Sequence, residues 1–241
     1  TERVIRLPDT YQANDKNQSH PAKASTRADH GLPAEGFVFC CFNNCNKITP
    51  QVFEVWMHLL RNVKNSVLWL LKDTESAKVN LIREAESRGV GSHRLIFSPK
   101  LPHGSHLERH HHIDLFLDTV PCNAHTTASD ALWMGVPLIT CCGEGFASRV
   151  AGSLLRAIEM PELITTSLPD YKALAQKLAT DTDALRNIRE KIARQRLTGP
   201  LFDTDRFARH LEAAYAMMYD RHVQGLPPAD FDVPPITGPS V

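Results

Sequence analysis

The sequence predicts an α/β fold, a doubly wound parallel sheet with additional helices at its C-terminal end. Short, continuous apolar runs alternate with stretches of helical periodicity from Phe37 onward. Strands buried on both faces of a parallel sheet have such unbroken apolar runs. The expected strands span residues 37–42, 66–72, 94–98, 113–118 and 137–141. The expected helices span residues 50–63, 75–89, 103–112, 126–134 and 146–158.

Three further helices are expected over residues 171–179, 183–197 and 205–222. The last one has an apolar stripe at helical spacing, which predicts docking onto the body of the domain. The stripe consists of Phe207, Leu211, Ala214, Tyr215 and Met218.

Composition divides the chain into three parts. Residues 1–36 are polar and aperiodic, which indicates a linker or surface excursion. Residues 37–223 contain the alternating strand and helix patterns and are expected to form one Rossmann-like lobe. Residues 224–241 contain repeated prolines and no apolar period, which is typical of a flexible tail. The chain opens on Thr1 in what reads as the middle of a segment, so we expect a piece of a longer protein.

Charge and cysteine usage limit the classes of function. The 27 basic and 27 acidic residues balance, so electrostatics give no case for nucleic-acid binding. The six cysteines lie beside apolar residues rather than at disulfide-module spacings, which indicates reduced thiols and a cytoplasmic protein. No signal peptide or membrane span is visible, so no membrane partner is expected.

The segment from Asp118 to Asp130 predicts a nucleotide site. It follows an apolar run and leads into a helix that begins near Thr126. Backbone amides at that helix end, together with the hydroxyls of Thr126 and Thr127, stabilise an anionic group. Asp130 follows one turn later, and a carboxylate accepts hydrogen bonds from both ribose hydroxyls. Loops 44–47, 98–106 and 121–130 all follow strands and are expected to converge on the same rim.

Structural interpretations of the same residues compete with the functional ones. The two threonines could cap a helix, and Lys47 could be a solvated loop lysine. His106, His110, His111 and His112 suggest a metal site, because residues four apart, such as His106 and His110, share a helical face. No cysteine pair completes the usual spacing, however, so we expect no metal site and a solvated face at His110–His112.

Six colinear segments then identify a resemblance. They read CFNNCNKI (41–48), NSVLWLL (65–71), FSP (97–99), LDT (117–119), CNAHTT (122–127) and GEGFASRV (143–150). In order and spacing they resemble the C-terminal lobe of protein O-linked N-acetylglucosamine transferases, especially bacterial members. The resemblance covers residues 37–219 and implies the UDP-sugar-binding, Rossmann-like lobe of a GT-B glycosyltransferase.

The resemblance also implies roles for the residues of the first two loops. Lys47 matches the lysine that contacts the diphosphate and stabilises the UDP leaving group, and Asn44 takes the place of a nearby polar residue. Leu101 and His103 belong to the stretch that pairs with the uracil edge. His103 replaces a lysine of the animal enzymes, which weakens that assignment. His106 matches the histidine that packs against the nucleoside.

The remaining roles fall on the third loop and on one neighbour of His106. Arg109 lies one helical turn beyond His106. Thr126 and Thr127 match the diphosphate-binding pair, His125 lies beside them, and Asp130 matches the ribose-binding aspartate. Gly145 departs from the pattern because relatives commonly have threonine there.

The implied activity is inverting transfer of N-acetylglucosamine from UDP to Ser or Thr of a protein, without a metal or other cofactor. Alternatives are a GDP-fucose protein O-fucosyltransferase, an Asn-glucosylating relative, and a nucleotide-sugar-binding module without catalysis. The implied N-terminal catalytic lobe and tetratricopeptide region have no counterpart, since no repeat of about 34 residues occurs. They would come from the same or another chain. The expected compartment is cytoplasmic, or nucleocytoplasmic in a eukaryote.

Overall fold

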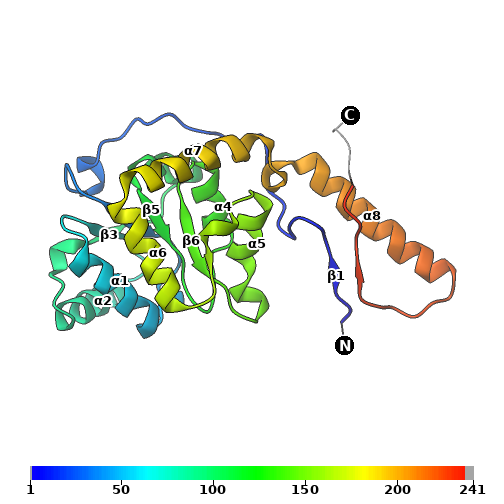
Figure 1. Cartoon of the computed structure of the whole chain (residues 1–241), viewed down its shortest axis with the longest axis horizontal. Coiled ribbons are helices and arrows are strands. Elements are labelled where there is room, and N and C mark those ends of the chain that lie inside the picture. The colour runs from blue at the N-terminus through cyan, green and yellow to red at the C-terminus, as the bar shows by residue number, and fades with distance from the viewer. Residues whose placement is uncertain (1, 237–241) are drawn as a thin grey trace.

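The computed structural model describes residues 2–236 and confirms the doubly wound parallel sheet (Figure 1). Six strands lie in the order β4-β3-β2-β5-β6-β7, all parallel. They are β2 (Val38–Cys41), β3 (Val67–Leu71), β4 (Leu95–Ser98), β5 (Leu115–Leu117), β6 (Leu138–Cys141) and β7 (Ile164–Thr165). Both β2 and β3 are buried along their whole length, as their unbroken apolar runs require.

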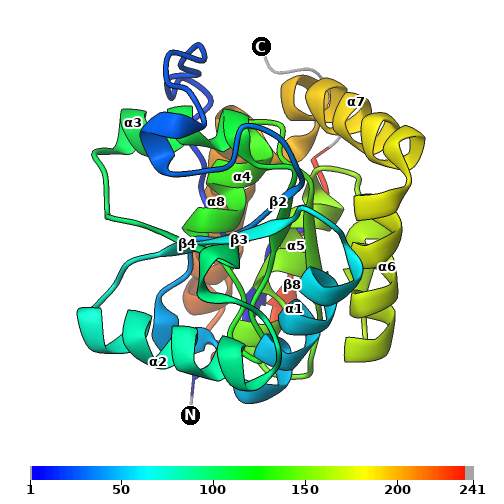
Figure 2. The same cartoon turned by 90° about the vertical axis from the view of Figure 1, so that its left-hand side faces the viewer.

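Helices cover both faces of this sheet. Helices α1 and α2 lie on one side, and α3 and α4 lie on the other (Figure 2). The bounds are α1 (Pro50–Asn62), α2 (Glu75–Ser87), α3 (His103–Glu108), α4 (Thr126–Trp133), α5 (Val150–Ala157), α6 (Leu168–Thr180), α7 (Thr182–Thr198) and α8 (Thr204–Val223). Within residues 2–236, no helix has the length and apolar composition needed to cross a membrane.

Helix α1 illustrates how local sequence positions these elements. Thr49 caps the helix by accepting from the amide of Val52, and Pro50 occupies the first turn, where its missing N–H is not needed. The helix buries Phe53 and Trp56 against the sheet side of the core. The Thr49 hydroxyl also donates to Val120 O at 3.1 Å, which connects the start of α1 to the loop after β5.

The docking predicted for the stripe on α8 is wrong for most of the helix. Only His210 and Ala214 are buried there, whereas Tyr215 is 58% and Met218 is 37% exposed. Figure 1 shows α8 extending away from the sheet, so the body of the domain reaches only its first turns.

Two segments from opposite parts of the sequence pair beside α8. Strand β1 (Ile5–Arg6) pairs in parallel with β8 (Phe231–Asp232), and Val233 is buried. The sequence analysis did not anticipate this pair because each strand has only two residues. The division at residues 36 and 223 stays a prediction. The tail predicted over residues 224–241 includes β8 and buried Val233, and its residues 237–241 lie outside the described residues, as does residue 1.

Candidate functional site

The candidate site lies at the carboxyl ends of β2 and β5. In the strand order, connections leave β2 toward β3 and β4 and leave β5 toward β6 and β7. The two halves of the sheet therefore diverge between these two central strands. In open α/β sheets a ligand crevice forms at this switch point. The loops after β2, β4 and β5 all end on this rim, as the sequence predicted.

The loop after β2 reaches across to the loop after β5. Lys47 ends a short helical turn, Cys45–Lys47, and its Nζ donates to Asn123 O at 2.8 Å. Buried Asn43 accepts a 2.6 Å hydrogen bond from the hydroxyl of Thr127. The adjacent Asn44, selected from the sequence, is exposed on the loop. Sequence reasoning missed Asn43, although an asparagine directly after an apolar strand was a signal for it.

Asp118 fixes the loop that carries the predicted phosphate site. Its fully buried carboxylate accepts from the amides of Thr119 at 2.7 Å and Ala124 at 2.6 Å. It also accepts from the hydroxyl of Thr140 at 2.6 Å. Burial raises the pKa of Asp118 to about 7 against the lowering effect of these donors and Lys47. Sequence reasoning saw Asp118 only as the start of a motif, although a carboxylate ending a buried strand calls for such partners.

The N-terminus of α4 faces this rim. The helix begins at Thr126, and its N-cap residue His125 supplies no side-chain cap. Amides in a first turn lack acceptors within the helix, so they remain donors toward a ligand anion. Thr126 is exposed and Thr127 is half-buried. Burial and the charge of Lys47 lower the pKa of His125, which therefore stays neutral near pH 7.

Asp130 lies between α4 and α3. Its carboxylate is largely buried, 3.4 Å from His103 Nε2 and 3.5 Å from His106 Nε2. Burial raises the pKa of Asp130, but the hydrogen bonds from both histidines outweigh that effect and the net shift is downward. The structure thus brings together three residues that the sequence analysis assigned to the nucleoside.

Arg109 lies beneath the rim rather than on it. Its side chain is buried, with Nη1 donating to Ser98 Oγ at 3.1 Å and to Pro99 O at 3.0 Å. Nε donates to Nδ1 of His106 at 3.1 Å, so the other ring nitrogen of His106 is left to donate to Asp130. Burial lowers the pKa of Arg109 to about 10. Arg109 holds His106 and the start of the loop that leads to half-buried Leu101.

The prediction that His110–His112 form a solvated face is wrong. His110 and His112 are 1% and 2% exposed. The turn Arg109–His112 lies under the segment around Ser25, whose hydroxyl contacts His112 Nε2 at 3.0 Å. Burial lowers the pKa of His110 to about 3. Among residues 2–236, no three His, Cys, Asp or Glu side chains are grouped as ligands of a metal ion.

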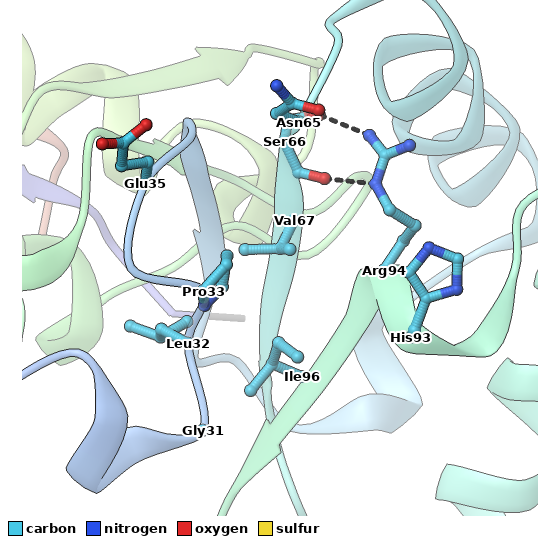
Figure 3. Close-up of a pocket in the computed structure, with 10 residues that line it drawn as sticks. All are labelled: Gly31, Leu32, Pro33, Glu35, Asn65, Ser66, Val67, His93, Arg94 and Ile96. Carbon is cyan, nitrogen blue, oxygen red and sulfur yellow. Dashed lines mark hydrogen bonds between the residues drawn. The ribbon is translucent and has the colours of Figure 1, made fainter.

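Two hollows must be distinguished. One of about 370 Å³ opens beside the rim, between the loops that follow β5 and β6, from Val120 to Ser148. Another of about 560 Å³ lies near the amino ends of β3 and β4 (Figure 3). In that second hollow, Arg94 is already bonded to Ser66 and to the carbonyls at the end of α1. Its guanidinium thus stabilises the fold, and the hollow lies away from the switch point.

A comparison with models of protein families identifies the family of this chain. The model of Glycosyl transferase family 41 matches residues 7–211. The chain belongs to glycosyl transferase family 41. The family 41 match includes all three loops of the candidate site and most of the segment that precedes the sheet.

Individual family 41 relatives agree. The chain is 37% identical over 97% of its length to a protein of Arabidopsis thaliana named probable UDP-N-acetylglucosamine–peptide N-acetylglucosaminyltransferase SEC. It is 36% identical over 84% of its length to the UDP-N-acetylglucosamine–peptide N-acetylglucosaminyltransferase of Caenorhabditis elegans. The chain spans only 24% and 18% of these two relatives.

Solved structures support the fold. A mutant O-GlcNAc transferase of Thermobaculum terrenum superposes with a TM-score of 0.73 at 31% identity, covering 79% of this chain and 37% of that one. Sucrose-phosphate synthase of Thermosynechococcus elongatus superposes with a TM-score of 0.62 at 14% identity, covering 86% and 51%. The second likeness concerns the fold alone.

Proposed function

We propose that this chain is the donor-binding part of a UDP-N-acetylglucosamine:protein O-GlcNAc transferase. The observation that carries the proposal is the arrangement of Lys47, the first turn of α4 and Asp130 along one rim at the switch point. A cation and free amides suit a diphosphate, and a buried carboxylate nearby suits a ribose. The names of the family 41 relatives support UDP-N-acetylglucosamine as the donor and a protein as the acceptor.

The proposed chemistry is inverting glycosyl transfer. The acceptor hydroxyl oxygen of Ser or Thr bonds to the anomeric carbon from the face opposite the UDP. The bond from that carbon to the β-phosphate oxygen breaks, and its electron pair leaves on UDP. Lys47 and the amides of Thr126 and Thr127 would stabilise the charge that develops there. These fixed donors supply the stabilisation without a metal ion, so metal-independent transfer stays part of the proposal.

The proposal assigns the other half of the reaction to another part of the protein or to another chain. The hydroxyl proton must pass to a base, and the acceptor must be held against the sugar. We assign both tasks to an N-terminal catalytic lobe, with a tetratricopeptide region beyond it. This chain by itself would then bind the donor and transfer nothing, as a non-catalytic module also would. Transfer restored by adding an N-terminal lobe would distinguish the two.

The first test is calorimetric titration of the chain with UDP, UDP-N-acetylglucosamine and GDP. Binding requires only this lobe, so we expect both uridine ligands to bind and GDP to bind much more weakly. Preference for GDP would overturn the proposal in favour of a fucosyltransferase. A folded chain that binds none of the three would contradict a nucleotide site on this rim.

A further inference from the structure

The segment before the sheet closes over the start of α4. The Tyr11 hydroxyl lies 3.1 Å from Nδ1 of His125, the residue that precedes the helix. The Tyr11 ring also packs edge-on against Phe146, with ring centroids 5.1 Å apart. One residue later, Gln12 Nε2 donates to Ser129 Oγ, in the first turn of α4, at 2.7 Å. Residues 11 and 12 therefore contact the helix end that the proposed function gives to the diphosphate.

Contacts on both sides hold this segment in place. Arg206 of α8 forms two hydrogen bonds with the carboxylate of Asp9, at 2.7 Å and 3.0 Å. Asn14 donates to Leu201 O at 3.1 Å and accepts from the hydroxyl of Thr204 through its own backbone oxygen at 2.8 Å. Bidentate arginine–carboxylate pairs fix direction as well as distance. Tyr11 is therefore presented to His125 by a braced stretch of chain.

The two ring nitrogens of His125 have different surroundings. Nδ1 faces the Tyr11 hydroxyl, whereas Nε2 is buried and has no protein partner among residues 2–236. Burial raises the pKa of Tyr11, so its hydroxyl keeps a proton that it can donate. A neutral imidazole that accepts at Nδ1 carries its own proton at Nε2. That tautomer turns the unpartnered nitrogen into a donor, which a ligand anion can satisfy.

We propose that Tyr11 is a positioning residue of the diphosphate site, which holds His125 in the tautomer that carries its proton on Nε2. The inference rests on the proposed function, because it takes the ligand to be a nucleoside diphosphate. It extends the site to a segment that lies outside the sheet and its helices. Tyr11 acts only through His125 and the start of α4.

The tautomer can be measured directly. Long-range ¹⁵N–¹H correlation spectra of the histidine-labelled chain distinguish a protonated nitrogen from a bare one in each ring. We expect His125 to have its proton on Nε2 in the wild type. In Tyr11→Phe, which keeps the ring and removes the hydroxyl, the two tautomers should mix or invert. A wild-type proton on Nδ1, or spectra unchanged by the substitution, would overturn the inference.

Binding supplies the second readout. Loss of one neutral hydrogen bond to a ligand-facing group should weaken UDP by about three- to tenfold in Tyr11→Phe. Uridine, which has no phosphate, should bind with the same affinity to both proteins. Tyr215→Phe is the matched control, because Tyr215 is an exposed tyrosine on α8. A loss of affinity that is equal for UDP and uridine would mean a general structural role and would contradict the inference.

The two readouts also separate this inference from the function on which it rests. If the wild type binds no UDP, the proposed function fails, and the spectra alone decide whether Tyr11 sets the His125 tautomer. If the wild type binds UDP and the tautomer does not respond to Tyr11→Phe, only the inference fails.

Discussion

At the scale of single residues, two buried carboxylates of the rim have opposite surroundings. Asp118 is enclosed by backbone and hydroxyl donors and fixes a loop, whereas Asp130 faces two histidines of α3. The first is fully buried, and protein donors already occupy both of its oxygens. Under the proposed function Asp130 would exchange its histidine contacts for ribose hydroxyls, and this difference makes it the better target for mutation.

Replacement of Asp130 by asparagine should weaken UDP about ten- to a hundredfold, since charged hydrogen bonds contribute roughly 1.5–3 kcal/mol. If the lost contacts are to the ribose, Asp130→Asn should weaken 2′-deoxy-UDP less than it weakens UDP, because only the 3′-hydroxyl contact remains to be lost. Titration of both ligands into both proteins forms a thermodynamic cycle. Asp183→Asn, at an exposed position of α7, is the control. An equal loss of affinity for both ligands in Asp130→Asn would contradict a contact between Asp130 and the ribose.

His110 should make the protein sensitive to acid. Burial lowers its pKa from 6.5 to about 3, so the unfolded chain takes up a proton before the folded chain does. Its contribution to stability is complete above pH 6.5 and declines as the pH falls toward 3, by up to about 1.4 kcal/mol per pH unit.

The measurement is urea unfolding at a series of pH values across that range. His110→Gln should have a flatter dependence of the free energy of unfolding on pH than the wild type. His222→Gln, at an exposed position near the end of α8, should follow the wild-type curve. Parallel curves for His110→Gln and the wild type would mean that His110 is not the group responsible.

At the scale of elements, the sequence predicted the body of the domain well. Apolar runs located β2 to β6, and helical periodicity located α1, α2 and α4, because burial on a two-sided sheet leaves a strong pattern. Strand β7, of two residues, and the pair formed by β1 and β8 are too short for any period. The exposed stripe of α8 was misjudged because periodicity reports an apolar face without saying what covers it.

The same limit applied to the candidate site. The order of motifs located the three loops. To decide between Asn43 and Asn44, however, one must know in which direction each side chain leaves the end of the strand. The burial of His112 required knowing that residues near Ser25 fold over it. Contacts with a segment of irregular structure leave no periodic signal in a sequence.

Arg206 should control the order of residues 9–16. Its bidentate pair with Asp9 joins this segment to α8, where His210 Nδ1 is a second neighbour of the Asp9 carboxylate at 3.4 Å. In Arg206→Ala, amide hydrogen exchange across residues 9–16 should become faster while exchange in β2 and β3 stays unchanged. Arg209→Ala removes an arginine of the same helix and should leave the segment protected. Unchanged exchange in Arg206→Ala would mean that other contacts suffice.

At the scale of the whole molecule, ligand binding should couple to folding. The site is assembled from loops after β2, β4 and β5, which come together only in the folded chain. UDP at a hundred times its dissociation constant should therefore stabilise the fold by about 2.7 kcal/mol. Thermal unfolding with UDP should have a higher midpoint than with the same concentration of GDP. Equal shifts for the two nucleotides would contradict recognition of uracil.

The pairing of β1 with β8 also has a mechanical consequence. The strands are parallel, so a force that pulls the two ends of the chain apart loads their hydrogen bonds in shear, all at the same time. The ladder is short, with Phe231 N donating to Val4 O and Val233 N donating to Arg6 O. In a single-molecule pulling experiment this pair should separate first, in a small extension that precedes rupture of the six-stranded sheet. The β1–β8 ladder would then yield to force first and leave the sheet that holds the site intact.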